Sequence, residues 1–101
     1  MNRARFSPRA EHDLDAVHDY IAADNPAAAA KVRLTILATA DFLAEHPAAG
    51  RRILKTRPRH SQIRWLVVPR YRNYLIFYQP LEATIVVVRV LHAAQDWTRF
   101  F

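Results

Sequence analysis

The stretch that decides the fold runs from Ile63 to His92 and reads IRWLVVPRYRNYLIFYQPLEATIVVVRVLH. It contains three runs of β-branched and aromatic residues, and such runs are typical of strands. We predict strands over Ile63–Val68, Tyr71–Gln79 and Thr84–Leu91. The last run is almost wholly apolar, which indicates a central strand covered on both faces. Because the connections between the runs are short, the three strands are expected to form an antiparallel meander.

Two helices are predicted before this stretch. Ser7-Pro8 and Asn25-Pro26 both mark helix starts, because Ser and Asn cap helices and proline fits the first helical position. The first helix is expected to end near Asp24 and the second to cover residues 26–46, where His46-Pro47 stops it. Apolar residues recur at helical spacing in both: Ala10, Leu14, Val17 and Ile21, then Ala29, Val32, Ile36, Ala40 and Leu43. The short joint therefore predicts an antiparallel hairpin that packs one face on the sheet.

The remaining segments are short. Arg3–Phe6 alternates polar and apolar residues and predicts a short strand. Residues 51–60 are basic, which predicts a loop with one edge strand around Ile53–Leu54, and residues 93–101 have room for one helical turn. The chain has 101 residues, 51% of them apolar. We therefore expect one domain over residues 1–101, of the α+β class, with the helical hairpin packed on a mainly antiparallel sheet.

The charge of the chain is unevenly distributed. Residues 1–50 carry five Lys and Arg against seven Asp and Glu, whereas residues 51–101 carry ten against two. Eight of those ten bases fall between residues 51 and 72, where there are no acids. Such a field favours an acidic partner, protein or nucleic acid, and speeds its approach. For any single one of these residues, a solvated surface position is the simpler explanation.

The composition argues against several classes of protein. There is no cysteine, hence no disulfide framework and no thiolate metal site, which suits a reducing cytosol. No signal peptide and no apolar stretch of roughly 20 residues is found, so we expect a cytoplasmic protein without a membrane partner. No cofactor is expected, because phosphate cradles need glycines that the chain lacks. No metal site is expected either, since Glu11-His12-Asp13 face different sides of a helix and Asp15 with His18 supplies only two ligands.

Metal-free cleavage of RNA is the chemistry that the residues of the sheet allow. It needs a base, an acid and cations around the scissile phosphate. The cations would be Arg64, Arg72 and Arg89 with Lys55, and His92 at the end of the last strand is the only histidine there that could serve as a base. A histidine that closes a buried strand is more often a structural hydrogen-bonding residue, so both roles stay open. Direct nucleic-acid binding is not expected, because the aromatic residues here sit at strand period, where some must fill the core.

Several short motifs follow one another along nearly the full length of the chain. In chain order they are Phe6-Ser7-Pro8-Arg9-Ala10-Glu11 with Leu14, Tyr20-Ile21-Ala22 with Asp24-Asn25-Pro26 and Ala29, Leu43 with Pro47 and Gly50-Arg51, the Arg64 strand, Tyr71-Arg72-Asn73-Tyr74 with Phe77-Tyr78, and Arg89-Val90-Leu91-His92 with Gln95-Asp96. Each is weak alone. In this order and spacing they resemble the ParE branch of the RelE/ParE superfamily, the toxins of bacterial type II toxin–antitoxin modules.

The resemblance implies a small RelE/ParE-like domain of β-α-α-β-β-β order and a cognate acidic, ParD-like antitoxin whose C-terminal segment wraps the toxin. Members of this branch are known for inhibiting DNA gyrase, so a gyrase poison without catalytic residues is the first expectation. The RelE branch instead cuts mRNA in the ribosome, using basic strand residues, which Arg72 and Arg89 match, and usually a tyrosine near the C-terminus, or a histidine in some relatives. No tyrosine follows His92, which leaves His92 as the only base. An mRNA endonuclease and a non-toxic, antitoxin-binding relative remain as alternatives.

Each partner then has an expected surface. The apolar side chains of an antitoxin would lie over an exposed stripe of the hairpin, and its segment would add a strand to a sheet edge, while its acids meet basic residues. The expected antitoxin contacts are Leu34, Leu37, Phe42, Arg51, Arg52, Arg57 and Arg64. For gyrase we expect an exposed aromatic and basic contact made by Trp97, Arg99, Phe100 and Phe101. The alternative is that Trp97 and Phe100 fold back on the sheet.

Overall fold

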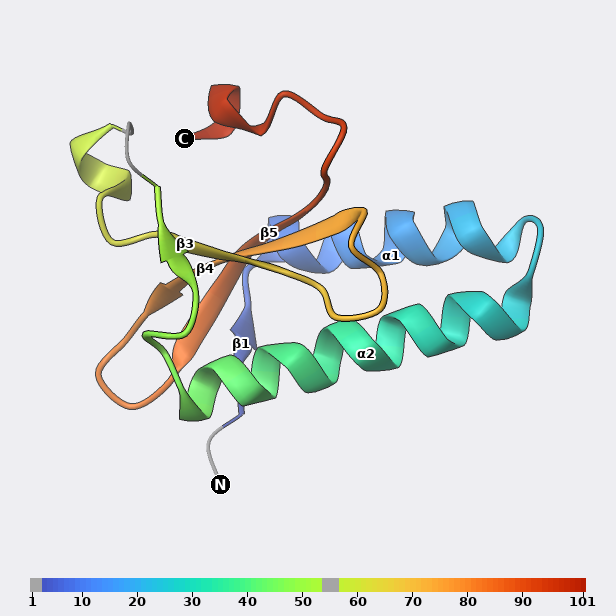
Figure 1. The fold of residues 1–101 in the computed structure, drawn as a ribbon, viewed down its shortest axis with the longest axis horizontal. Coiled ribbons are helices and arrows are strands. Elements are labelled where there is room, and N and C mark those ends of the chain that lie inside the picture. Colours follow the sequence, from blue (N-terminus) through green and yellow to red (C-terminus); the bar gives the residue numbers. More distant parts are fainter. Residues whose placement is uncertain (1–2, 54–56) are drawn as a thin grey trace.

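The structure is a computed structural model that describes residues 3–53 and 57–101 (Figure 1). A short strand leads into two long helices, and the remaining strands follow in the second half of the chain. The elements are β1 Arg5–Phe6, α1 Pro8–Ala22, α2 Pro26–Glu45, β2 Arg51–Arg52, β3 Arg64–Val67, β4 Tyr74–Pro80 and β5 Ile85–His92, with short 3₁₀ helices η1 Pro58–His60 and η2 Trp97–Phe100. The α+β class and the order of the long elements are therefore as predicted.

The strands form one sheet in the order β1-β5-β4-β3-β2. Strand β1 runs parallel to β5, with Phe6 opposite Val87, and the other neighbours are antiparallel. The meander β3-β4-β5 is confirmed, because short turns join strands that are neighbours in the sheet. The longest pairing joins β4 to β5, which places β5 in the interior of the sheet, as its apolar sequence predicts.

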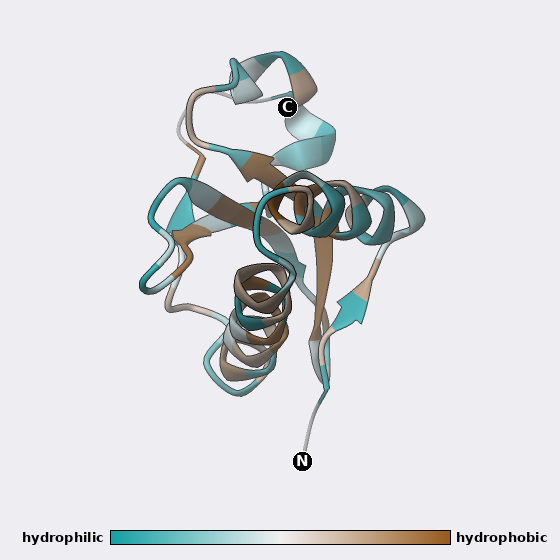
Figure 2. Ribbon diagram, turned by 90° about the vertical axis from the view of Figure 1, so that its right-hand side faces the viewer, coloured by the Kyte–Doolittle hydropathy of each residue, from teal (hydrophilic) through white to brown (hydrophobic). Residues whose placement is uncertain are grey.

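Both helices begin where the sequence predicts. The Ser7 hydroxyl accepts a hydrogen bond from the Ala10 N–H at 3.1 Å, and the Asn25 side chain accepts one from the Ala28 N–H at 3.0 Å. Proline follows each cap as the first helical residue, where its missing N–H has no cost. Helix α1 has a hydrophilic outer face, whereas α2 is apolar over much of its circumference (Figure 2). An apolar outer face on α2 is surface that the fold itself does not cover.

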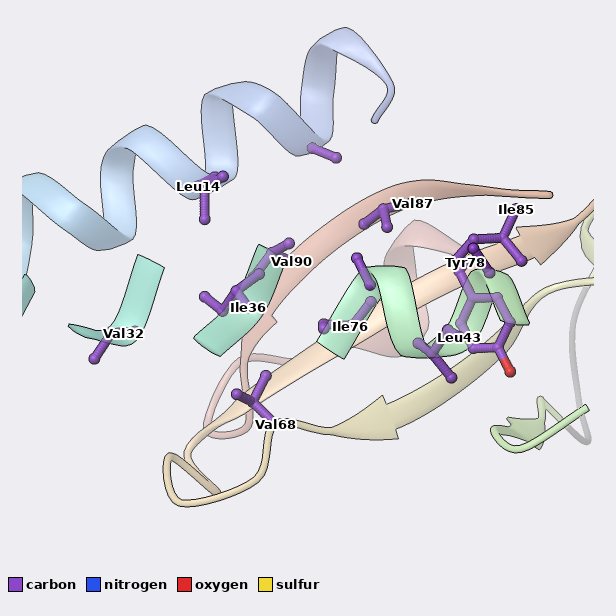
Figure 3. Packing of buried hydrophobic residues seen from close by; sticks show 13 residues of the cluster. Leu14, Val32, Ile36, Leu43, Val68, Ile76, Tyr78, Ile85, Val87 and Val90 are labelled. Atoms are coloured by element: carbon purple, nitrogen blue, oxygen red, sulfur yellow. The ribbon is translucent and has the colours of Figure 1, made fainter. Parts of the chain in front are cut away.

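The first core cluster lies between the helical hairpin and one face of the sheet (Figure 3). Ile36 and Leu43 of α2 and Leu14 of α1 meet Ile76 and Val87 of the sheet, all of them buried. Tyr78 joins this cluster with its hydroxyl at the far end of α2, where it donates to the Pro47 carbonyl at 2.8 Å and accepts from the Gly50 N–H at 2.8 Å. The chain after α2 is thereby fastened to β4.

The second core cluster covers the opposite face of the sheet. Its buried members are Ile53, Ile63, Leu75, Phe77, Leu91 and Phe101, with Trp65, Val67, Val88, Trp97 and Phe100 partly buried around them. The C-terminal segment folds back over this face, and the Phe101 ring stacks on Phe77 with 4.8 Å between centroids. The sheet is therefore covered on both faces, by the helices on one and by the C-terminal segment on the other.

Two strand boundaries differ from the predictions. The strand expected from Tyr71 begins at Tyr74, because the Tyr71 N–H bonds to the Val68 carbonyl and the Tyr74 N–H to the Tyr71 carbonyl, which makes residues 71–73 a turn. The edge strand expected around Ile53–Leu54 lies at Arg51–Arg52. Ile53 extends the ladder by one bond to Ile63, and Leu54 lies outside the described residues. No helix in the described part of the chain is long and apolar enough to cross a membrane.

Candidate functional site

His92 lies at the end of β5, beside a groove between α1 and the sheet. This groove encloses about 340 Å³ and is also lined by Tyr20, Tyr74 and Gln95. The His92 ring meets Tyr74 edge-on, and its Nδ1 accepts a hydrogen bond from the Ala94 N–H at 3.0 Å. A backbone N–H can only donate, so the neutral ring carries its proton on Nε2. His92 therefore presents a donor to the groove, not the lone pair that a general base needs.

Arg89 is held by Asp13 of α1. Its Nε donates to Oδ2 at 2.7 Å and its Nη2 to Oδ1 at 3.1 Å, with the two side chains only 13% and 12% exposed. The guanidinium also lies 4.4 Å from the centre of the Phe100 ring. A cation that already has a bidentate carboxylate and an aromatic cover is poorly placed to receive a phosphate.

The other candidate cations lie elsewhere. Arg64 on β3 donates to the carbonyl of Gly50, the residue just before β2, at 2.8 Å. Arg72 is exposed in the turn before β4, so its predicted position on a strand is wrong. Lys55 lies outside the described residues. Because Arg64 pairs with Tyr78 at one end of β4 and Arg72 precedes Tyr74 at the other, the structure does not bring the predicted catalytic residues together.

A second groove runs between α2 and the end of β3. It encloses about 560 Å³ and is lined by Leu34, Thr35, Ala38, Thr39, Phe42, Leu66, Pro69 and Arg70. Leu34 and Phe42 are 66% and 51% exposed, so the groove presents two large apolar side chains to solvent. Arg70 sits beside them with a left-handed backbone (φ 69°), which directs the chain out of β3. We call this the α2 groove.

Leu37 does not belong to the α2 groove. It lies on the other side of α2, in a hollow between the two helices with Leu14 and Arg33, and it packs against the first core cluster. The expected stripe of Leu34, Leu37 and Phe42 is therefore divided between two sides of the helix. Of these three residues, only Leu34 and Phe42 are exposed in the same groove, where one partner could contact both.

The arginines expected to meet an antitoxin also divide. Strand pairing places Arg52 opposite Arg64, and Arg64 lies on the same face as Leu66, toward the helices and the α2 groove. Arg51 points to the opposite face, where its guanidinium lies 5.9 Å from the centre of the Trp65 ring. The Arg57 N–H bonds to the Phe101 carbonyl at 3.1 Å, so Arg57 lies beside the C-terminal segment.

The C-terminal residues are not the free contact that the sequence predicts. Phe101 is only 6% exposed and Trp97 packs on Phe77, with 5.4 Å between ring centroids, as part of the second core cluster. Phe100 is half-buried between two guanidinium groups, those of Arg89 and Arg99. The expectation of four exposed residues is therefore corrected: Arg99 alone is exposed, and the aromatic rings cover the sheet.

Two features of these surfaces escape the sequence pattern. Burial raises the pKa of the Tyr74 hydroxyl, and the neighbouring Tyr20 raises it further, so Tyr74 stays a neutral donor in the first groove. Asp13, which is not part of the apolar stripe of α1, reaches the sheet. Its spacing of three from Ala10 and four from Val17, two members of the apolar stripe, was the available signal. Across residues 3–53 and 57–101, no three His, Asp or Glu side chains gather into a metal site.

The chain matches known proteins over nearly its whole length. Residues 4–97 match the family profile described as ParE toxin of type II toxin-antitoxin system, parDE. The Y4kP protein of Sinorhizobium fredii is 37% identical over 97 residues, covering 94% of this chain and 92% of that protein. The toxin RelE2 of Caulobacter vibrioides is 38% identical over 95 residues, covering 94% and 99%.

A solved structure extends the comparison to the fold. A chain of the chromosomal ParDE toxin–antitoxin system from P. aeruginosa superposes with a TM-score of 0.70 at 23% identity, covering 91% of this chain and 96% of that one. At this identity the likeness shows the shared fold. The profile match and the two relatives, each spanning nearly the whole chain, show the family. The chain belongs to the ParE toxin family of type II toxin–antitoxin systems.

Proposed function

We propose that this toxin acts by binding DNA gyrase, without catalysing a reaction, and that a cognate ParD-like antitoxin neutralises it. The observation that supports this most is that the fold itself occupies the candidate catalytic groups. Arg89 is paired with Asp13, Arg64 with the Gly50 carbonyl, and the Nδ1 of His92 with the Ala94 N–H. A protein that acts by binding needs none of these groups to be free, whereas a nuclease does.

The RelE-type activity is the second candidate. It is favoured by the 38% identity to a toxin named RelE2 and by the position of His92 beside an open groove. For His92 to act as a base, Nδ1 would have to release the Ala94 N–H, or Nε2 would have to lose its proton first. Arg72 also lies in the turn before β4, at the opposite end of that strand from Arg64. For these two reasons the nuclease is the second candidate.

The α2 groove is the proposed seat of the antitoxin. Its apolar floor fits the apolar side chains of an extended or helical segment, and Arg70 lines it. Arg64 and Arg52 follow on the same face of the sheet. Acids of the antitoxin would meet these arginines, which speeds association. Leu37 is left out of this contact because it packs between the helices.

Two assays on the purified protein separate the candidates. Gyrase supercoiling and mRNA cleavage on translating ribosomes are measured side by side, with wild type and His92→Ala. We expect both proteins to inhibit supercoiling, the antitoxin to reverse this, and neither to cleave mRNA. Cleavage by wild type that His92→Ala loses would establish the nuclease instead. Antitoxin binding with neither activity would identify a non-toxic relative.

The antitoxin seat is tested by Leu34→Glu and Phe42→Ala, measured by calorimetric titration with the antitoxin. Both side chains are largely exposed, so we expect weaker binding with little change in stability. Tyr20→Ala is the matched control, because Tyr20 is 78% exposed and lines the other groove. Equal losses in all three variants, or a loss confined to Tyr20→Ala, would move the antitoxin away from the α2 groove.

A further inference from the structure

Four exposed arginines surround the C-terminal segment, and the functions above do not use them. They come from three parts of the chain: Arg51 from β2, Arg57 and Arg59 from the η1 segment, and Arg99 from η2. Figure 1 shows η1 and the C-terminal end side by side, next to β2 and β3. We call these four residues the tail-side patch.

Specific contacts hold the three parts together. The Phe101 carbonyl accepts from the Arg57 N–H at 3.1 Å and lies 3.2 Å from the Nδ1 of His60. Arg51 lies over Trp65 of the second core cluster, and Arg99 lies over Phe100, with 5.1 Å to its ring centre. The arginines therefore stand on a packed base, the second core cluster, and not on separate loose loops.

The side-chain ion pairs described for arginines do not include these four. The pairs formed by described Arg side chains are Arg33 with Asp15 and Arg89 with Asp13, both in other parts of the fold. Asp96 precedes η2, and its carboxylate accepts from the Thr98 hydroxyl. A surface that presents several cationic side chains attracts an anionic ligand.

The surroundings of the patch favour a nucleic acid over a protein as that ligand. Protein interfaces have an apolar centre, whereas protein–DNA interfaces are polar and strongly positive. The two exposed apolar grooves described above lie at α2 and at His92, and the aromatic rings beside the patch are buried or partly buried in the second core cluster. All four cations are arginines, whose planar guanidinium binds two phosphate oxygens at once.

We propose that the tail-side patch binds the phosphate backbone of duplex DNA. The choice of duplex DNA over RNA rests on the proposed gyrase target, because gyrase works on duplex DNA that passes over its surface. The toxin would then hold the enzyme through one surface and the DNA through this one. Arg57, expected from the sequence to meet the antitoxin, belongs to the DNA contact in this assignment, as does Arg51.

The test is titration of a fluorescent DNA duplex with the purified toxin, without gyrase, followed by anisotropy over a range of salt concentrations. We expect a dissociation constant on the order of micromolar at low salt and a steep dependence on salt. The variant Arg57→Ala/Arg59→Ala/Arg99→Ala should lower the slope of log affinity against log salt by about 2.7, because each lost phosphate contact contributes about 0.9. The corresponding triple lysine variant should keep most of the slope.

A matched control removes the same charge from the opposite edge of the sheet. Arg3→Ala/Arg5→Ala/Arg9→Ala changes three exposed arginines at and around β1, which is the edge strand farthest from β2. We expect this control to keep the wild-type slope. Circular dichroism and thermal melting check the fold of both triple variants, which we expect to be kept because the changed side chains are exposed.

Each other outcome overturns the proposal. No binding to duplex, or equal losses in the two alanine variants, would mean that net charge alone is at work. Tighter binding to single-stranded RNA than to duplex would assign the patch to RNA, and binding to a poly-glutamate peptide but not to DNA would assign it to an acidic protein. Gyrase is absent from the titration, so its result is independent of the supercoiling assay. One of the two proposals can therefore fail while the other stands.

Discussion

Asp13 and Arg89 stand 76 residues apart in the chain and are joined by two hydrogen bonds, of 2.7 and 3.1 Å, that tie α1 to β5. The same carboxylate accepts the Val90 N–H at 3.0 Å. Strand β1 pairs with β5 only as far as Val87, and Asp13 takes the place of the missing strand neighbour beyond it. The Asp13 side chain thus fixes α1 against β5, satisfies a backbone N–H at the sheet edge and neutralises Arg89.

Removing one partner of this pair should destabilise the protein strongly. We expect Asp13→Ala to lower the free energy of unfolding by about 3–5 kcal/mol, because it leaves a buried guanidinium without a counter-charge. The double variant Asp13→Leu/Arg89→Met should lose less than Asp13→Ala, since an apolar pair needs no compensation. Urea denaturation measures both. A loss below 1 kcal/mol in Asp13→Ala would show that the pair is solvated.

Gly50 is required by a close approach and not by its backbone angle. A Cβ at this position would lie 2.5 Å from the Tyr78 hydroxyl oxygen and 2.9 Å from the Trp65 carbonyl oxygen. We expect Gly50→Ala to cost about 1–3 kcal/mol, as other overpacked sites do. In Gly50→Ala/Tyr78→Phe the hydroxyl is gone. The double variant should therefore lose less stability than the sum of the losses in the two single variants.

Thermal melting measures the four members of this cycle, and Ala49→Ser, at an exposed neighbour, is the control. Strict additivity of the two changes would indicate that the loop moves away from Tyr78, and the contact would then have no structural role.

Much of the fold follows from local sequence chemistry. The two helix starts are set by Ser7 and Asn25 with the prolines after them, and the three long strands by runs of β-branched residues. These signals act within a few residues, so they are visible in the sequence. The turn at residues 71–73 is predicted as strand, because the aromatic residues Tyr71 and Tyr74 flank it and only the hydrogen bonds of Tyr71 end the ladder.

The candidate surfaces were less predictable, because they depend on contacts between distant segments. The sequence shows that Leu34 and Leu37 are both apolar residues of one helix. Which of them is covered depends on where α1 packs: Leu37 lies between the helices and Leu34 lies in the α2 groove. Arg89 is a free cation in the sequence and an ion-paired one in the structure, since its partner lies 76 residues earlier. The C-terminal rings were expected to be exposed, and the apolar second face of the sheet explains why they are not.

Stability should depend on pH through Tyr78. Burial raises the pKa of its hydroxyl above the ordinary value of 10.0, although the Gly50 N–H and the charge of Arg64 each lower it in part. Between the ordinary and the raised pKa the unfolded chain loses this proton while the folded chain keeps it. The contribution is therefore complete below pH 10 and is lost as the pH rises through the folded value.

We expect the free energy of unfolding to fall above pH 10, and to fall less steeply in Tyr78→Phe. At neutral pH this variant should already be about 1–3 kcal/mol less stable, because the Gly50 N–H and Pro47 carbonyl lose their partner. Urea denaturation over a pH series measures both effects. Tyr74→Phe is measured in parallel, since the pKa of Tyr74 is also raised. Parallel pH profiles for wild type and Tyr78→Phe would contradict the assignment.

The C-terminal segment should behave as part of the core. Phe101→Ala removes a buried ring that stacks on Phe77, and we expect a loss of about 3–5 kcal/mol. Arg99→Ala, two residues away and exposed, should change stability by less than about 0.5 kcal/mol. Deletion of residues 97–101 would then reduce toxicity simply by unfolding the protein, so it does not test target binding.

Arg99→Ala and Phe101→Leu are the informative changes in that segment, because they keep the second core cluster packed. If the segment contacts gyrase or its DNA through Arg99, the first should weaken supercoiling inhibition while the second leaves it intact. Denaturation curves and supercoiling assays on the same preparations make the comparison. A Phe101→Ala protein as stable as wild type would mean that the C-terminal rings do not cover the sheet in solution, and the exposed contact expected from the sequence would return.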